Sequence, residues 1–332
     1  MTSQTVIPND APIETQSSRL LHDAAMRILA VDLSGDIVVA LLKFAAAAAT
    51  ASSAMFSEGI HSVMDMATEL TLLYGIIASR RPATIEHQFG FGREGYFWNF
   101  IASLLILAAG AGVTLHDGIE QIVAPVPLHH EETDFAVLLG ALLIEVATLV
   151  YAIRNGAFPR QGGRWHTLLS GNRDTSSLTV LFTSAASILG LLLAALGIGL
   201  GRALHEPRLD GLASVAIALV LTSIAFAIAA RSKAMLIGAA ASPELVARLM
   251  LIAGDHPAVA TINGAMTVHL SADQLLVTMS VAFKTGLETT QIEEAVAEIR
   301  ARLHDELPVV AFVSIHPQSE RQYQALQARR GW

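Results

Sequence analysis

Residues 57–79 read SEGIHSVMDMATELTLLYGIIAS, a long apolar stretch that nevertheless contains His61 and Asp65. No Lys or Arg occurs between Phe44 and Ser79, and about 20 apolar residues suffice to cross a bilayer as a helix. A helix has 3.6 residues per turn, so His61 and Asp65 share one face. Ionisable groups inside a membrane are costly and by default indicate an ion pathway. Imidazole and carboxylate together suit a divalent metal such as zinc.

The composition of the whole chain also indicates a membrane protein. Of its 332 residues 53% are hydrophobic and 15% are charged, whereas a soluble domain has about 25% charged residues. The net charge of −8 and the lack of a basic, aromatic-rich cluster exclude a nucleic-acid partner. Without cysteine there are no disulfides, iron–sulfur clusters or thiolate zinc sites. No nucleophile motif, phosphate loop or cofactor fingerprint occurs, so neither an enzyme nor a bound cofactor is expected.

Six segments are apolar enough to span a bilayer. They are residues 30–53, 58–79, 96–123, 135–153, 176–200 and 211–230. We expect a transmembrane domain over residues 28–232, preceded by a disordered cytoplasmic tail at residues 1–27. This tail lacks the basic and then apolar order of a signal peptide.

The charges of the loops predict the orientation. Basic residues gather on one side: Arg80, Arg81, Arg93, Arg154, Arg160, Arg164, Arg173, Arg231 and Lys233. On the other side, the first and third loops contain no Lys or Arg, and the fifth loop contains only Arg202 and Arg208. The positive-inside rule then places both termini in the cytoplasm. Together with the missing signal peptide, this pattern fits a cell (inner) membrane.

Residues 233–318 change to the pattern of a small α+β domain. Ser242 and Pro243 are a helix start, residues 262–270, 275–283 and 309–316 read as strands, and a capping box at Thr290–Glu293 opens a second helix. The order αββαβ predicts a ferredoxin-like or metallochaperone-like cytoplasmic domain, followed by a tail at residues 319–332. Two helices on one face of a sheet leave the other face exposed, so we expect a homodimer formed through this domain.

Several motifs resemble the cation diffusion facilitator family. MFSEGIHSVMD at residues 55–65 resembles its second-helix signature, HQFGFGREGYFW at 87–98 its loop before the third span, and LIEVATLVYAIR at 143–154 its fourth span. The resemblance covers roughly residues 30–317. It implies a homodimeric exporter of Zn²⁺, Fe²⁺, Mn²⁺ or Co²⁺ that exchanges the metal for protons, with His61 and Asp65 as metal ligands.

The fifth span departs from this family. The resemblance implies a tetrahedral site with two further ligands from span five, which in one branch are Glu and Asp. Thr183 and Ser184 stand at those positions, and residues 176–200 contain no His, Asp, Glu, Asn or Gln. Two strong ligands with neutral hydroxyls make a poor zinc site.

Three interpretations follow from this departure. In the first interpretation, other groups complete the site. The candidates are Glu69, which lies one turn beyond Asp65, the pair of Asp32 and Asp36, the Ser184 hydroxyl and water. Alternatively, the substrate is a harder ion such as Mn²⁺ or Mg²⁺, for which oxygen ligands are adequate. Lastly, transport is lost and the protein acts as a membrane scaffold, heterodimer subunit or regulator.

The remaining candidates each have a structural alternative. The pattern favours an interfacial carboxylate near a helix end for Glu69, and for Asp36 it favours an ion pair with Lys43 or a side chain that reaches the interface. Glu145 fits either a proton or metal relay or a hydrogen bond between packed helices. His116 and Asp117, and the HHEE run at residues 129–132, lie towards the external side, where a solvated loop is expected.

Overall fold

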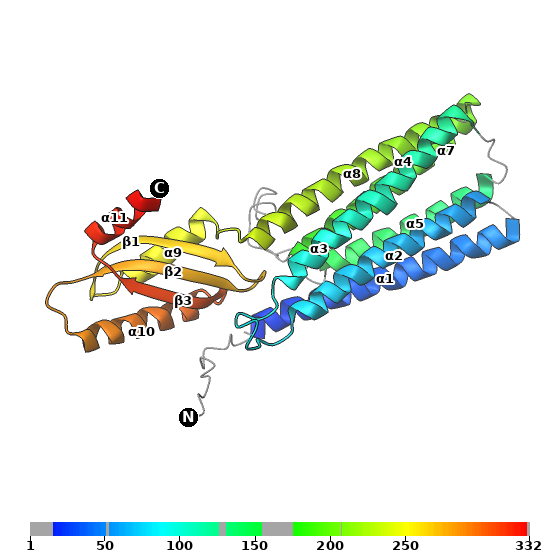
Figure 1. Ribbon diagram of the computed structural model, residues 1–332. Helices are drawn as coiled ribbons and strands as arrows, with labels where there is room; N and C mark the ends of the chain where they lie inside the picture. Colours follow the sequence, from blue (N-terminus) through cyan, green and yellow to red (C-terminus); the bar gives the residue numbers. More distant parts are fainter. Residues whose placement is uncertain (1–15, 51–52, 126–130, 155–174, 207, 331–332) are drawn as a thin grey trace.

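The computed structural model describes residues 16–50, 53–125, 131–154, 175–206 and 208–330. A bundle of long helices and a small sheet domain lie end to end, joined after the last long helix (Figure 1). The helices of the bundle are α1 Gln16–Thr50, α2 Ser53–Ser79, α3 Glu94–Leu105, the π-helix η1 Ile106–Ala111, α4 Gly112–Val123, α5 Glu131–Ala152, α7 Thr175–Leu204 and α8 Arg208–Ile237. The segments α3, η1 and α4 follow one another without a break.

Each of the six predicted spans corresponds to one of these helices. Among the described residues, three helices are long and apolar enough to cross a membrane: Glu94–Val123, Phe182–Leu204 and Arg208–Ile237. A shorter apolar stretch covers Ala136–Ala152 in α5, while α1 and α2 are made less apolar by their ionisable residues. Helix α1 begins at Gln16, within the segment expected to be a disordered tail. Most of that segment, residues 1–15, lies outside the described residues.

Glycines allow α4 and α8 to approach closely. A Cβ built on Gly211 would lie 2.8 Å from the carbonyl oxygen of Gly118, and a Cβ on Gly118 would lie 3.0 Å from the carbonyl oxygen of Gly211. Both separations are well below ordinary van der Waals contact. Lipid is as apolar as a leucine side chain, so membrane helices associate largely through such close packing of small residues. This contact therefore fixes α8 against the third membrane helix.

The C-terminal domain has the predicted αββαβ order and one further helix. Its elements are α9 Pro243–Gly254, β1 Val259–His269, β2 Leu275–Phe283, α10 Thr289–Glu306, β3 Val310–Pro317 and α11 Glu320–Arg330. The sheet order is β1-β2-β3, with β2 antiparallel to β1 and parallel to β3. The predicted fold class, a helical membrane domain followed by a small α+β domain, is thus confirmed. The predicted capping box at Thr290–Glu293 is wrong: Glu288 caps α10, with Gln291 at the third helical position.

One face of the sheet forms the core of this domain. Alternate β2 residues, among them Val277 and Met279, are fully buried against α9 and α10, where Leu249 and Leu303 are also fully buried. The helix α11 lies on the other face. There a Cβ on Gly264 would overlap the Tyr323 hydroxyl.

A short linker fixes the sheet domain to α8. Helix α8 ends at Ile237, and the next residue, Gly238, has a φ of +105°, a conformation that favours glycine. Beyond it, the backbone N–H of His269 donates to the carbonyl oxygen of Ala239 at 3.1 Å. The α2–α3 connection contacts the same region, since Phe89 stacks edge-on against Phe312 of β3 with ring centroids 5.2 Å apart.

We expect Gly211→Ala and Gly118→Ala to lower the melting temperature in detergent, because either methyl group must push α4 and α8 apart. Overpacking of this kind costs about 1–3 kcal/mol. Gly140→Ala is the matched control, since nothing lies within 4 Å of its added Cβ and alanine favours a helix. The close contact has no energetic role if all three variants melt at the same temperature.

The buried imidazole of His269 predicts a pH-dependent stability. It is 1% exposed, and its Nε2 has no hydrogen-bond partner among the described residues. Burial, and to a lesser degree the nearby Arg231 guanidinium, lowers the pKa of His269 below 6.5. As the pH falls from about 6.5 to 5, the unfolded chain takes up a proton that the folded chain does not, so stability falls.

Thermal melts of the full chain between pH 5 and 8 measure this dependence. His269→Leu should flatten the acid side of the profile, because it removes the titrating group. His304→Gln, which changes an exposed histidine of α10, should keep the wild-type slope. An unchanged slope in His269→Leu would contradict the assignment.

Candidate metal site

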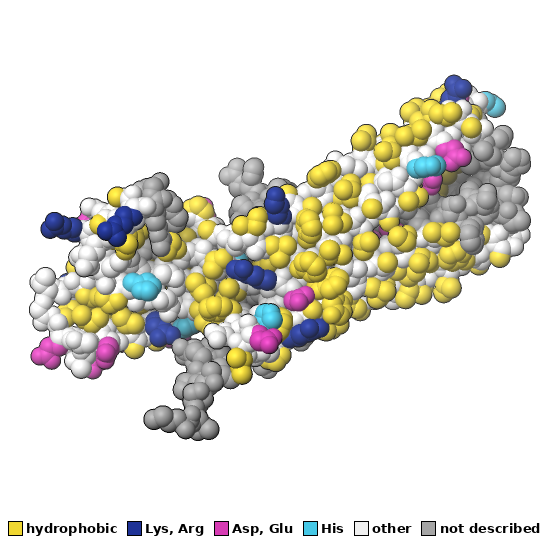
Figure 2. All heavy atoms as spheres, viewed as in Figure 1, with side chains coloured by type: hydrophobic (Ala, Val, Ile, Leu, Met, Phe, Trp, Pro, Cys, Tyr) yellow, Lys and Arg dark blue, Asp and Glu magenta, His cyan; other side chains and the backbone are white. Residues whose placement is uncertain are grey.

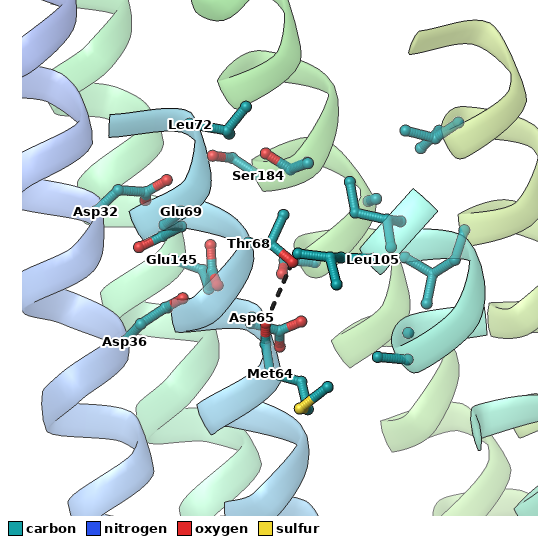
Figure 3. Close-up of a pocket in the computed structure, with 18 residues that line it drawn as sticks. Asp32, Asp36, Met64, Asp65, Thr68, Glu69, Leu72, Leu105, Glu145 and Ser184 are labelled. Atoms are coloured by element: carbon teal, nitrogen blue, oxygen red, sulfur yellow. Dashed lines mark hydrogen bonds between the residues drawn. The ribbon is translucent and has the colours of Figure 1, made fainter. Parts of the chain in front are cut away.

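Five carboxyl groups line one cavity within the helix bundle. Asp32 and Asp36 come from α1, Asp65 and Glu69 from α2, and Glu145 from α5. The cavity has a volume of about 70 Å³, which suits an ion rather than an organic ligand, whose pockets measure about 300–1,000 Å³. In Figure 3, Glu69 and Glu145 lie between Asp32 and Asp36. The two i, i+4 pairs seen in the sequence therefore face each other across α1 and α2.

Glu69 is at the centre of this group. Figure 3 shows its carboxyl group beside those of Asp32 and Asp36, and carboxyl groups this close in a low-dielectric interior cannot all stay ionised. Its Oε2 is buried and has no hydrogen-bond partner among the described residues. Glu69 therefore faces the carboxyl groups of α1 within the bundle.

Helix α7 faces the cavity with hydroxyl groups. Thr183 and Ser184 both line it, and Ser184 is 5% exposed. Ser187, one turn further along α7, lines it too. Span five therefore supplies neutral oxygen atoms where the resemblance implies charged ligands.

A buried lysine lies beside the carboxyl groups. The Nζ of Lys43 on α1 donates to the Ser62 hydroxyl of α2 at 2.9 Å, and its charge attracts Asp36. The structure thus supports both interpretations of Asp36, which lines the cavity and also interacts with Lys43. Such an attraction stabilises charge that a low-dielectric interior would otherwise disfavour.

The predicted site residues are brought together with one exception. Asp65, Glu69, Asp36, Glu145, Thr183 and Ser184 all line the cavity. His61 belongs to α2, but its side chain lies outside the described part of the structure, so its role as a ligand stays a prediction. Asp32 was not among the main candidates, although its i, i+4 spacing from Asp36 was a signal. The hydroxyls of Thr68 and Ser187 gave no sequence signal.

A second group of ligand-type atoms lies at the far end of α4. Within the described residues, one group of ligand-type side chains has its ligand atoms within 4.8 Å of one another. It consists of His116, Asp117 and Glu120. All three side chains are at least 60% exposed, and His116 contacts both carboxylates at 3.7–3.8 Å. Surface contacts of this kind are weak, which agrees with the solvated region expected there. Residues 126–130 of the adjoining loop lie outside the described residues.

Comparison with known proteins gives the same picture. Residues 29–237 match the family model of the cation efflux transmembrane domain. The chain is 30% identical to the proton-coupled zinc antiporter SLC30A9, mitochondrial, of Xenopus laevis over 76% of this chain and 46% of that protein. It is 27% identical to metal tolerance protein C4 of Arabidopsis thaliana (68% and 50%) and 24% identical to the manganese efflux system protein MneP of Bacillus subtilis strain 168 (59% and 63%).

The chain spans about half the length of the SLC30A9 relatives and of metal tolerance protein C4. The family match itself covers more than half of this chain and contains every helix that lines the carboxylate cavity. The bundle of apolar helices and the small sheet domain fit the same family. The chain therefore belongs to the cation diffusion facilitator family, whose members are transporters of metal cations rather than enzymes.

Proposed function

We propose that this protein exports a divalent metal cation in exchange for protons, and that the ion binds in the carboxylate cavity. The observation that carries the proposal is the convergence of five carboxyl groups from α1, α2 and α5 on one ion-sized cavity. Carboxyl groups inside a membrane are expensive unless something compensates them. A transported cation and exchanged protons are compensation of this kind.

The donor atoms support a choice of substrate. The polar side chains described around the cavity offer only oxygen, from carboxyl groups of Asp and Glu and from the hydroxyls of Thr68, Thr183, Ser184 and Ser187, and Met64 adds a thioether sulfur. Oxygen ligands favour Mn²⁺ over softer ions, whereas an imidazole favours Zn²⁺, Fe²⁺ or Co²⁺. If His61 also coordinates the ion, zinc becomes the preferred substrate. The relatives named as a zinc antiporter and as a manganese efflux protein support these two ions.

The cavity also supports exchange with protons. Several close carboxyl groups cannot all remain charged in a medium of low dielectric constant. Protons neutralise them when the metal is absent, and Glu69, which lies among the other carboxyl groups, is the group that we propose holds one such proton. An entering divalent cation displaces protons, and protons entering from the other side release the cation.

The alternative is a transport-impaired protein that serves as a scaffold, heterodimer subunit or regulator. It rests on the neutral residues Thr183 and Ser184 in span five. Both residues line the cavity together with the carboxyl groups, which supports retained transport.

Orientation and assembly belong to the same proposal. The basic loops support cytoplasmic termini, and with them efflux across a cell membrane, although one relative is named as mitochondrial. A homodimer formed through the sheet domain likewise stays a prediction.

Metal flux into proteoliposomes tests the transport proposal. With an imposed pH gradient we expect uptake of Zn²⁺, Mn²⁺, Fe²⁺ or Co²⁺, reduced at least about tenfold by Asp65→Asn or His61→Ala because each removes a charged or strong ligand. Glu120→Gln, an exposed carboxylate at the far end of α4, should transport normally. Folded protein without flux of any of the four metals would favour the scaffold alternative.

Glu69→Gln tests the exchange step separately. Calorimetric titration of metal in buffers of different ionisation enthalpy counts the protons released on binding. We expect the variant to release about one proton fewer than wild type, because the amide cannot hold that proton. Asp117→Asn should release the wild-type number. The same count in Glu69→Gln would show that the cavity carboxyl groups are not the exchanging groups.

A further inference from the structure

A second and much larger cavity lies where the helix bundle meets the sheet domain. Its volume is about 840 Å³, twelve times that of the carboxylate cavity and within the range of pockets for organic ligands. On the bundle side it is lined by α2, the α2–α3 connection and α3, and on the sheet side by β1 and β2. The cavity is therefore at the level where the long helices leave the membrane.

Aromatic rings form the wall on the bundle side. The ring of Tyr74 packs edge-on against Trp98 with centroids 4.7 Å apart, and Phe97 packs against Trp98 at 5.4 Å. The indole N–H of Trp98 donates to Glu94 at 2.7 Å, which fixes the ring. Tyr74 and Phe97 are each 44% exposed. Tyrosine and tryptophan are enriched at the level of lipid headgroups, so this wall marks the membrane surface.

Charges of both signs adjoin these rings. Arg93 and Glu86 line the cavity and are exposed, and Arg81 donates to the hydroxyl of the lining residue Tyr74 at 3.2 Å. Figure 2 shows Lys and Arg side chains beside acidic and hydrophobic ones around the junction of the two domains. A guanidinium recognises a phosphate through paired hydrogen bonds, and a carboxylate pairs with an ammonium group.

We propose that this cavity binds one zwitterionic phospholipid with a primary ammonium headgroup, of the phosphatidylethanolamine class. Arg93 and Arg81 pair with the phosphate, Glu86 pairs with the ammonium, and an acyl chain lies along Tyr74, Phe97 and Trp98. The bound lipid bridges the α2–α3 connection and the sheet domain. Neither a free ion nor a phosphate alone accounts for the apolar aromatic wall, and an acyl chain alone does not account for the arginines.

Native mass spectrometry of the full chain in detergent tests this assignment. We expect one phosphatidylethanolamine per chain, bound saturably, with affinity reduced at least tenfold by Arg93→Gln and by Phe97→Ala. The control is Arg208→Gln, an exposed arginine at the opposite end of α8, which should bind lipid as wild type does. Because Arg93 is exposed, its replacement leaves the packing of the helices intact. Equal affinity in all four proteins would overturn the proposal.

Competing ligands separate the possible occupants. Diacylglycerol lacks the phosphate headgroup, phosphatidylglycerol lacks the ammonium, and glycerol phosphate lacks the acyl chains. Each of them should bind at least tenfold more weakly than phosphatidylethanolamine. Equal binding of glycerol phosphate would overturn the lipid assignment, and equal binding of phosphatidylglycerol would overturn the role of the ammonium. The lipid assignment would also be overturned if the protein formed a dimer that retained no lipid and that could be cross-linked between the two copies at position Phe97.

Fluorescence gives an independent measure of contact. Trp98 is one of three tryptophans, and replacing Trp165 and Trp332 by Phe leaves it as the sole reporter. Brominated phosphatidylethanolamine should quench Trp98 at one lipid per chain in detergent, and Arg93→Gln should require at least tenfold more lipid for the same quenching. Quenching that rises linearly with lipid in both proteins would indicate general solvation and contradict a site.

Discussion

Compensation of charge in a low-dielectric interior governs the membrane half of this protein. Asp32, Asp36, Asp65, Glu69 and Glu145 would repel one another strongly if all were ionised. The bundle offsets this repulsion with hydroxyls from α7, a lysine on α1 and protons. The hydroxyls are neutral and the protons are mobile, so this part of the compensation can be exchanged for an incoming cation. A site compensated only by fixed positive side chains would have no such freedom.

The helices that hold this site are packed in different ways. Helices α1 and α2 pack through apolar residues such as Leu29 and Leu72 and through the Lys43–Ser62 hydrogen bond, whereas α4 and α8 meet through glycine backbones. The Lys43–Ser62 contact is polar, and the glycine contact is steric and lies away from the cavity. The sheet domain has a separate apolar core and reaches the bundle through a short linker and the α2–α3 connection. Changes at the cavity therefore need not disturb the fold of the sheet domain.

Local patterns made much of the fold predictable. The alternation of Leu275, Val277, Met279 and Val281 identified β2 because one face of that strand is buried. The capping box was misplaced, since Glu288 is an unusual N-cap and Thr290 is a common one. The site was only partly predictable. Spacing placed Asp65 with Glu69 and Asp32 with Asp36, but only tertiary packing shows that the two pairs face each other.

The π-helical segment Ile106–Ala111 has a consequence for the register of the third membrane helix. A π-helix contains more residues per turn than an α-helix, so the residues on its two sides follow different helical phases. Ile106 and Gly110 line the carboxylate cavity, while Gly118 in α4 meets Gly211 of α8. The phase difference lets one continuous helix direct one stretch towards the cavity and the next towards its neighbour.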